Sequence, residues 1–229
     1  MDKRFWLILG GIIALLIGVF VITGGKADNS GSNFAGEPTE IQDDDRIVNP
    51  NASRDVVLIE YGDFECPGCG ALHPVLKQMH QEFADNVTFV FRHFPLTNIH
   101  RNAFAAHRAA EAAHRQNQFF AMHDLLFENQ EAWNGPSALD AQGVTVEQAT
   151  SIFEQYAQML ELDIDQFKAD FASEDVANTI NSHVSSGRTL GLNSTPSLLL
   201  NGQSIPTPSS LEEMRQLLQA AVEEASQDS

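Results

Sequence analysis

The sequence predicts an α/β domain with an inserted helical region, preceded by one transmembrane helix. Three observations lead to this class. Residues 5–23 are apolar and uncharged, residues 56–91 read as strand, helix and strand, and about 98–185 keep a helical spacing before a final strand pair. A chain of 229 residues is long enough for one domain with a substantial core plus a further segment.

The first element is the apolar stretch 5–23, which carries no charged side chain. As a helix it would reach roughly 28 Å, about one hydrocarbon core. Lys3 and Arg4 precede it and acidic residues soon follow, which places residues 1–4 in the cytoplasm and the rest outside. The alternative is a signal peptide cut after Ala27, but the apolar run exceeds the roughly 7–15 residues of such peptides. We therefore favour a retained anchor.

Residues 24–52 differ in composition from what flanks them. They are polar and charged, include the run Asp43-Asp44-Asp45, and lack apolar periodicity. Such a segment buries too little apolar surface to fold by itself. We predict a flexible linker here that connects the membrane to a domain over 53–229.

The domain begins with a strand, a helix and a second strand. Residues 56–59 are a short β-branched run typical of a buried strand, and 87–91 resemble them. Between them Pro67 suits the first turn of a helix, and the apolar positions Leu72, Leu76 and Met79 continue it. This βαβ unit predicts two parallel strands with a right-handed connection.

The remaining elements follow the helical segment of about 98–185, for which Gly187 is the expected stop. Residues 197–200 form an apolar strand, and Asn201-Gly202 is a strong signal for a type I′ hairpin turn. The spacing of apolar residues over 211–221 predicts a last amphipathic helix.

Only two cysteines occur, in the motif Cys66-Pro67-Gly68-Cys69. A bridge between them would close almost no loop and stabilise little, so a chemical role is the better interpretation. Cys66 falls at the expected helix N-terminus, where unpaired N–H groups favour a thiolate. We therefore expect Cys66 to be the nucleophile and Cys69 the resolving thiol.

The environment predicts how far the pKa of Cys66 falls. Pro67 and Gly68 bring no positive charge near the sulfur, so we expect a pKa below about 8.5 but not at the low extreme of such thiols. Glu65 would oppose the decrease if it lies close to the sulfur.

Three further positions allow two interpretations each. Glu60, six residues before Cys66, is either a buried acid that exchanges a proton with Cys69 or a solvated residue at the strand end. Thr195-Pro196 precedes the apolar strand as an ordinary turn or with a cis bond. His73, one turn beyond Cys69, is better explained as a surface or packing residue than as a catalytic one.

Three segments resemble DsbA-like oxidoreductases, in particular the membrane-anchored bacterial type. They are the stretch from Glu60 to Cys69, Arg92-His93-Phe94-Pro95-Leu96, and the stretch 194–202 around Pro196. The resemblance implies a thioredoxin-like fold with an inserted helical domain and a catalytic role for Glu60. It also implies that Pro196 is a cis-proline facing the cysteines, and that Thr195, with Pro67 and Gly68, contacts the substrate.

The dipeptide Pro-Gly departs from the Pro-His of the strongly oxidising archetype, which leaves the direction of electron flow open. We favour an extracytoplasmic oxidase of protein thiols, whose partners are substrate proteins with cysteine thiols or disulfides. The resemblance adds a membrane thiol oxidase that restores the disulfide. No cofactor and no metal is predicted.

Other classes fit less well. A disulfide reductase or isomerase would use the same residues, although isomerases usually add a dimerisation domain. A tethered peptide-binding domain would not need two thiols. Zinc normally takes four ligands, and no second C-x-x-C is present, while His100, His107 and His114 are spaced as on a helix surface. A net charge of −18 argues against nucleic acid as a partner.

Overall fold

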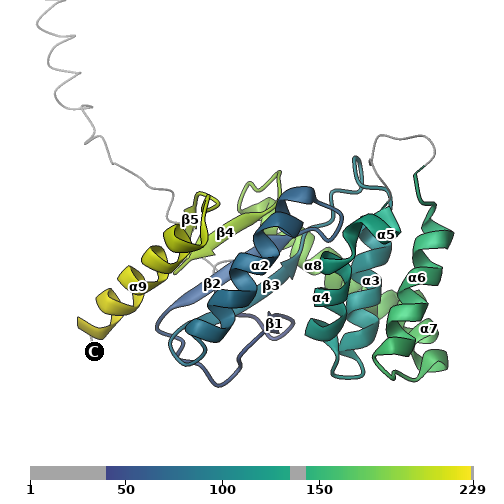
Figure 1. The fold of residues 1–229 in the computed structure, drawn as a ribbon, viewed down its shortest axis with the longest axis horizontal. Helices are drawn as coiled ribbons and strands as arrows, with labels where there is room; N and C mark the ends of the chain where they lie inside the picture. Colours follow the sequence, from purple (N-terminus) through teal and green to yellow (C-terminus); the bar gives the residue numbers. More distant parts are fainter. Residues whose placement is uncertain (1–39, 135–142, 228–229) are drawn as a thin grey trace, which may run out of the picture. The chain divides into compact units, whose positions relative to one another are not determined.

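A five-stranded mixed sheet forms the centre of the fold in the computed structural model, which describes residues 40–134 and 143–227. The strands lie in the order β1-β3-β2-β4-β5 (Figure 1). Their bounds are β1 Arg46–Ile47, β2 Val57–Gly62, β3 Thr88–His93, β4 Ser197–Leu200 and β5 Gln203–Ile205.

The predicted βαβ unit is present. β2 and β3 pair in parallel, and helix α2 (Pro67–Glu82) connects them. β4 pairs antiparallel with both β2 and β5. The turn between β4 and β5 has Asn201 and Gly202 at φ 49° and 76°, the left-handed pair that a type I′ turn requires. The hairpin is therefore confirmed.

The helices divide into two groups. Helices α2, α8 and α9 pack on the sheet. Helices α3 to α7 stand beside it as the predicted helical insertion (Figure 1). The bounds are α3 Ala103–His114, α4 Phe119–Glu128, α5 Gln130–Asn134, α6 Val146–Met159, α7 Ile164–Ala172, α8 Glu174–Thr189 and α9 Leu211–Gln227.

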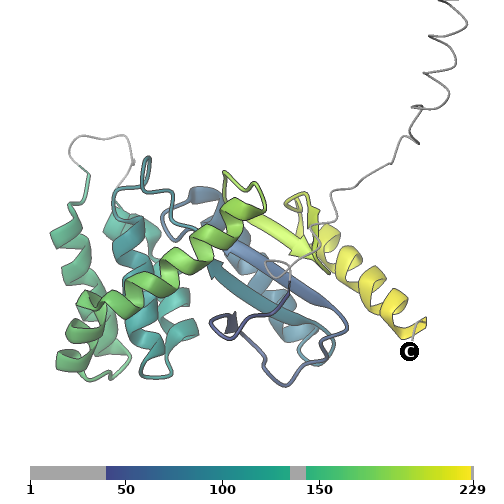
Figure 2. The ribbon, with the colours of Figure 1, turned by 180° about the vertical axis from the view of Figure 1, so that it is seen from behind.

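Both faces of the sheet are covered. On one face, α2 and α9 bury Leu58 and Phe89 with Leu76 and Leu218. On the other, α8 crosses the sheet on its way from the helical region, as Figure 2 shows. The core on that side includes Tyr61. Burying both faces explains why the parallel strands read as continuous apolar runs.

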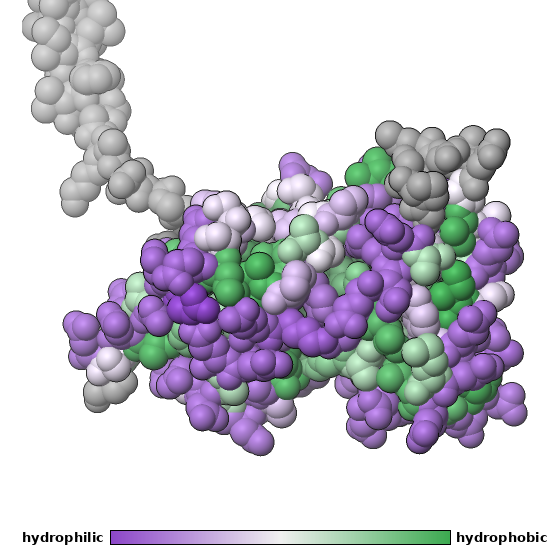
Figure 3. Space-filling view, viewed as in Figure 1, coloured by the Kyte–Doolittle hydropathy of each residue, from purple (hydrophilic) through white to green (hydrophobic). Residues whose placement is uncertain are grey.

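Helices α3 to α7 have a core of their own, with Trp133 and Phe153 fully buried. Phe64 and Cys69 belong to the same cluster, so the turn that carries the cysteines packs against the insertion. The outer surface is mostly hydrophilic on the face drawn in Figure 3, as the net charge of −18 leads one to expect.

Gly187 is not the helix stop that its sequence position suggested. It lies inside α8, where a Cβ would come within 2.7 Å of Phe94 Cε2. The glycine is needed for close packing of α8 on the segment after β3. The helix ends at Thr189, and Gly191 follows with φ 78°, the left-handed conformation that commonly closes a helix.

Part of the predicted linker belongs to the fold. β1 pairs antiparallel with β3, and the neighbouring Asp45 and Arg46 are buried. Sequence composition misled here because these charges are buried in ion pairs, which polarity alone does not reveal. The predicted span 5–23 lies outside the described residues. Within 40–134 and 143–227, no helix is long and apolar enough to cross a bilayer.

Candidate active site

The cysteine motif lies where β2 gives way to α2. Cys66 is the N-cap of α2, Pro67 occupies the first helical turn, and Cys69 follows one turn later. Both cysteines are buried, but Cys66 keeps 8% of its surface exposed and Cys69 none, so Cys66 is the less buried of the pair. The two thiols are not bonded to each other in this structure. The backbone N–H of Asp63 donates a hydrogen bond to Cys69 Sγ at 3.5 Å.

Thr195 and Pro196 face this motif from the segment before β4. The Thr195–Pro196 bond is cis, as the resemblance implied. Cys66 Sγ donates to the carbonyl oxygen of Thr195 at 3.3 Å. A Cβ on Gly68 would lie 3.2 Å from Pro196 Cδ, so the glycine lets the two segments approach closely. The structure thus brings Cys66, Gly68, Thr195 and Pro196 together.

The two thiols have opposite acidity. A hydrogen bond from the Cys69 thiol, together with backbone N–H groups at the helix start, lowers the pKa of Cys66 to about 5. Burial and the interaction with Cys66 raise the pKa of Cys69 well above its ordinary value. The more exposed sulfur is therefore the one ionised at neutral pH, which agrees with the expected roles of nucleophile and resolving thiol.

Glu60 lies on β2 beneath α2 and is 8% exposed, so the solvated alternative is wrong. Burial, and then the negative charge of Cys66, raise the pKa of Glu60 to about 8. A cavity of about 10 Å³ adjoins Glu60, with His80 and His123 also in its wall. That volume is close to the smallest that holds one water. Glu60 is thus mostly protonated at neutral pH and borders a cavity close to the size of one water.

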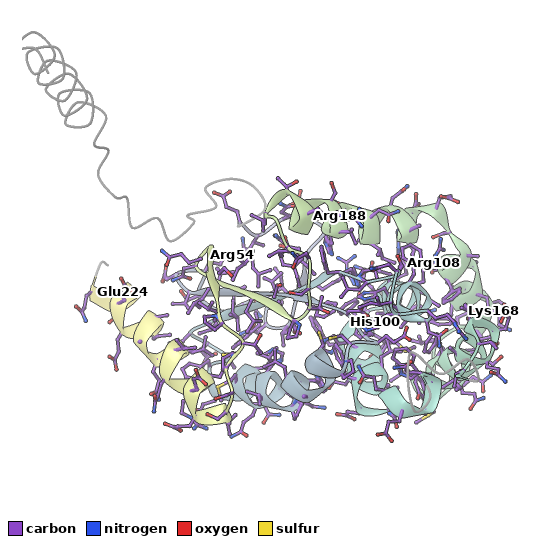
Figure 4. All side chains as sticks on the ribbon, turned by 90° about the horizontal axis from the view of Figure 1, so that it is seen from above. Arg54, His100, Arg108, Lys168, Arg188 and Glu224 are labelled. Carbon is purple, nitrogen blue, oxygen red and sulfur yellow. The ribbon has the colours of Figure 1, made fainter. Side chains whose placement is uncertain are left out.

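Asp63 and His100 form a pair that sequence reasoning missed. Nδ1 of His100 donates to Oδ2 of Asp63 at 2.7 Å, and the N–H of Leu96 donates to the same oxygen. This hydrogen bond, and further the charge of Cys66, raise the pKa of His100. Figure 4 shows His100 near the N-terminal end of α2. His100 is therefore protonated more readily than a free histidine, and its pKa responds to Cys66, although the cysteine motif itself contains no basic residue.

Asn102 and Gln130 of the helical insertion hydrogen-bond to the turn that precedes α2. Glu65 is buried and accepts a hydrogen bond from the N–H of Asn102 at 2.6 Å. Gln130 of α5 donates to the carbonyl oxygens of Phe64 and Cys66 at 2.6 and 2.9 Å. Two elements far apart in sequence thereby orient the start of α2. No local sequence pattern around Gln130 predicts this contact.

The other histidines are more buried than expected. His107 is fully buried on α3 and hydrogen-bonded to His93 at 2.6 Å, so its assignment to a helix surface is wrong. Most of α3 is packed on all sides, which its many alanines permit. His73 is 6% exposed and stacks against Phe127, in agreement with a packing residue.

The comparisons with known proteins agree with this architecture. The family model described as Thioredoxin matches residues 43–220. Among curated proteins, the chain is 31% identical over 179 residues to the Na(+)/H(+) antiporter NhaA 3 of Salinispora tropica, covering 78% of this chain. The alignment covers 25% of that antiporter, so this chain spans about a quarter of its length.

Solved structures show the same fold. Alpha-DsbA1 of Wolbachia pipientis superimposes with a TM-score of 0.66 and 18% identity, over 81% of this chain and 94% of that one. BdbD of Bacillus subtilis gives 0.66 and 16%, over 79% and 94%. A thioredoxin-like oxidoreductase of Silicibacter pomeroyi gives 0.58 and 23%, over 81% and 94%. The chain therefore belongs to the family described as Thioredoxin, and its fold is similar to those of the DsbA-like structures.

Proposed function

We propose that this protein is a membrane-anchored, extracytoplasmic thiol-disulfide oxidoreductase that oxidises the thiols of substrate proteins. The observation that carries the proposal is the unequal acidity of the pair. Cys66 has a pKa lowered to about 5 at the mouth of the site, and Cys69 lies buried behind it with a raised pKa. A pair of this kind supplies one attacking or leaving thiolate and one protected resolving thiol.

The reaction is an exchange of one disulfide for another. A substrate thiolate attacks Cys66 Sγ of the Cys66–Cys69 disulfide, forming a mixed disulfide, and Cys69 leaves as a thiolate that takes up a proton. The second substrate thiol, once deprotonated, attacks the substrate sulfur of the mixed disulfide, and Cys66 leaves as a thiolate. Two electrons pass from the substrate dithiol to the protein, and the substrate gains the disulfide.

The oxidising direction follows from the stability of the reduced form. A thiolate at Cys66 is a good leaving group, and each unit by which its pKa falls below ambient pH favours the reduced protein about tenfold. The side chains of the Pro67-Gly68 dipeptide supply no charge for this stabilisation. The Cys69 thiol lowers the pKa of Cys66 most, and the backbone N–H groups of Cys69 and Gly68 at the helix start lower it further.

The remaining predicted residues support the exchange. Glu60, whose raised pKa keeps it protonated, is proposed to supply the proton that Cys69 takes up, because the two buried groups interact electrostatically. The Thr195 carbonyl and the backbone around it are placed to bind an extended substrate segment. A groove of about 640 Å³ beside Pro67 and Gln130 offers room for more of that segment.

The cellular setting is part of the proposal. Residues 1–4 would lie in the cytoplasm, 5–23 would span the membrane, and the residues from 24 to about 39 would connect it to the catalytic domain, which includes β1 at Arg46–Ile47 and the helical insertion at about 98–185. Disulfides persist outside the cytoplasm, which suits this chemistry. A membrane thiol oxidase would return the reduced pair to the disulfide, as the resemblance implies.

The test is the reduction potential of the pair, measured on the full-length chain in glutathione buffers. Potentials in this fold run from roughly −270 mV in reductants to about −120 mV in strong oxidants. We expect a value nearer the upper end. A value at the lower end would replace the oxidase by a reductase.

Two matched variants check the roles of the sulfurs. Cys69→Ser should accumulate a mixed disulfide with substrate through Cys66, because no resolving thiol remains. Cys66→Ser should form none, because the remaining Cys69 is buried. Equal trapping by both variants would contradict the assigned roles.

A further inference from the structure

Two histidines and two carboxylates meet where α2 packs on α4, one helical turn beyond Cys69. His73 comes from α2, and His123, Asp124 and Glu128 come from α4. Ligand atoms of His73, His123 and Asp124 all lie within 4.8 Å of one another. His73 Nε2 is 3.7 Å from Asp124 Oδ1 and 3.9 Å from Glu128 Oε1.

The His73 ring gives a second, independent observation. Its side chain is 6% exposed, and Nε2 has no hydrogen-bond partner among the described residues. Leaving such a nitrogen buried and unpaired destabilises the folded protein. The nitrogen points toward two carboxylate oxygens that are too far away to accept a hydrogen bond. A cation between them would satisfy all three groups.

The spacing fits a transition metal. Zinc binds imidazole nitrogen and carboxylate oxygen at about 2.0–2.2 Å in a tetrahedron, which sets the ligand atoms roughly 3.3–3.6 Å apart. The measured separations bracket this range: 3.1 Å from His123 Nδ1 to Asp124 Oδ1, and 3.7 and 3.9 Å from His73 Nε2. Small side-chain adjustments would close the site.

Lys77 shows that the cluster already attracts a cation. Its ammonium lies 2.6 Å from Asp124 Oδ2 and 2.7 Å from Glu128 Oε1. The Lys77 side chain is 42% exposed, and ion pairs at such exposure contribute little to stability. It can therefore turn into solvent when a divalent ion binds.

We propose that His73, His123, Asp124 and Glu128 bind one divalent transition-metal ion of the zinc class, which displaces Lys77. Mixed imidazole and carboxylate ligands suit zinc better than calcium or magnesium, which prefer oxygen alone. Burial lowers the pKa of both histidines, so their nitrogens are free of the extra proton at neutral pH. The ion would join the helix that carries Cys69 to the helical insertion.

A second cluster, Asp44, Asp45 and His183, is less suited to a metal. The Asp45 carboxylate already accepts hydrogen bonds from Arg92 at 2.6 and 2.8 Å. That cluster supplies a control. Asp44→Asn changes a comparable acid next to a buried histidine without touching the proposed site.

The experiment is a zinc titration of the full-length protein with the Cys66–Cys69 disulfide formed, so that no thiolate competes for the ion. A chromophoric chelator reports the free zinc. We expect one zinc per chain. Asp124→Asn and His73→Gln should each weaken binding by at least roughly 10- to 100-fold, the loss caused by removing even an outer partner of a ligand.

Two further variants make the result decisive. Lys77→Met removes the competing ammonium and should strengthen zinc binding, whereas Asp44→Asn should leave it unchanged. Circular dichroism and disulfide exchange check that each variant is folded. The proposal is overturned if the wild type binds no zinc, if binding survives both Asp124→Asn and His73→Gln in folded protein, or if Asp44→Asn abolishes it.

Discussion

Buried carboxylates occur in two settings in this protein. Glu60 lies under the helix of the cysteine motif, and in the described part of the chain no ion pair reaches it. Asp45 and Glu111 lie where the sheet meets the helical insertion, and an arginine binds each with two hydrogen bonds. Arg92 reaches Asp45 at 2.6 and 2.8 Å, and Arg46 reaches Glu111 at 2.8 and 2.6 Å.

The partner decides the charge of a buried acid. Burial raises the pKa of Glu60 to about 8, so it is neutral at pH 7. Burial acts on Glu111 as well, but hydrogen bonds from His93 and Arg46 outweigh it and lower its pKa. A paired carboxylate remains ionised and holds two regions together, whereas an unpaired one can take up and release a proton near neutral pH.

The largest expected effect is the loss of a buried arginine. Arg92→Met leaves the fully buried Asp45 carboxylate without its main cation, which should lower the free energy of unfolding by about 3–5 kcal/mol. Urea unfolding of the full-length protein measures it. Arg215→Met is the matched control, because Arg215 pairs with Glu82 at the surface and exposed pairs contribute about 0–1 kcal/mol. Equal losses in the two variants would contradict the structural role of the buried pair.

At alkaline pH, Glu60→Gln should raise the free energy of unfolding, which is the opposite of the effect of Arg92→Met. The folded-state pKa of Glu60 is raised from 4.5 to about 8, so the folded state binds the extra proton and stability falls as pH rises through that window. The glutamine variant lacks this penalty. Above pH 8 it should exceed the wild type in stability by on the order of 3 kcal/mol, with little difference below pH 4.5.

The same variant tests the proposed proton transfer. Stopped-flow measurement of exchange should show a slower step at Cys69, while the pKa of Cys66 changes little. A variant with unchanged kinetics and a flat stability difference across pH would mean that Glu60 is neither strained nor used.

The smallest effect is expected at His100. His100→Gln removes a cation near Cys66, so the pKa of Cys66 should rise by about half to one unit. The reduction potential should fall by about 15–30 mV. The matched control is His114→Gln, because His114 lies at the far end of α3 and its pKa responds to burial and Arg46 rather than to the cysteines. Ultraviolet absorbance of the thiolate against pH measures the Cys66 pKa.

The effect of His100 should also depend on pH. Its folded-state pKa is raised above 6.5 by Asp63, with smaller contributions from Glu65 and Cys66. The charge is therefore fully present below pH 6.5 and lost as pH rises through the raised pKa. The difference in potential between wild type and variant should shrink in the alkaline range. A constant difference would assign His100 a packing role instead.

Much of the site was predictable because its chemistry is local. The motif from Cys66 to Cys69 defines both sulfurs within one helical turn, and the alternation of apolar runs defines the βαβ unit that carries it. Asn201-Gly202 likewise specifies its turn through backbone conformation alone. The position of Glu60 could be predicted, but its burial depends on α2 lying above it.

The sequence-based predictions were wrong where a residue contacts residues that are far away in the sequence. Gly187 was interpreted as a helix stop, yet it is required by packing against Phe94. Asp45 and Arg46 were assigned to a linker because a sequence does not show that they pair with Arg92 and Glu111 in the folded protein. Polar composition predicts solvent exposure only when no distant partner neutralises the charge.

The sequence by itself determined the fold class, the redox motif and the order of the main elements, because periodicity, turn residues and cysteine spacing act over a few residues. Only the tertiary structure decided which polar side chains meet around the cysteine motif and α2. His100 reaches Asp63 across 37 positions, Gln130 reaches Cys66 across 64, and His73 faces a helix some 50 residues away. Electrostatic interactions depend on distance and burial in space, and those are set when α2, the sheet and the helical insertion pack together.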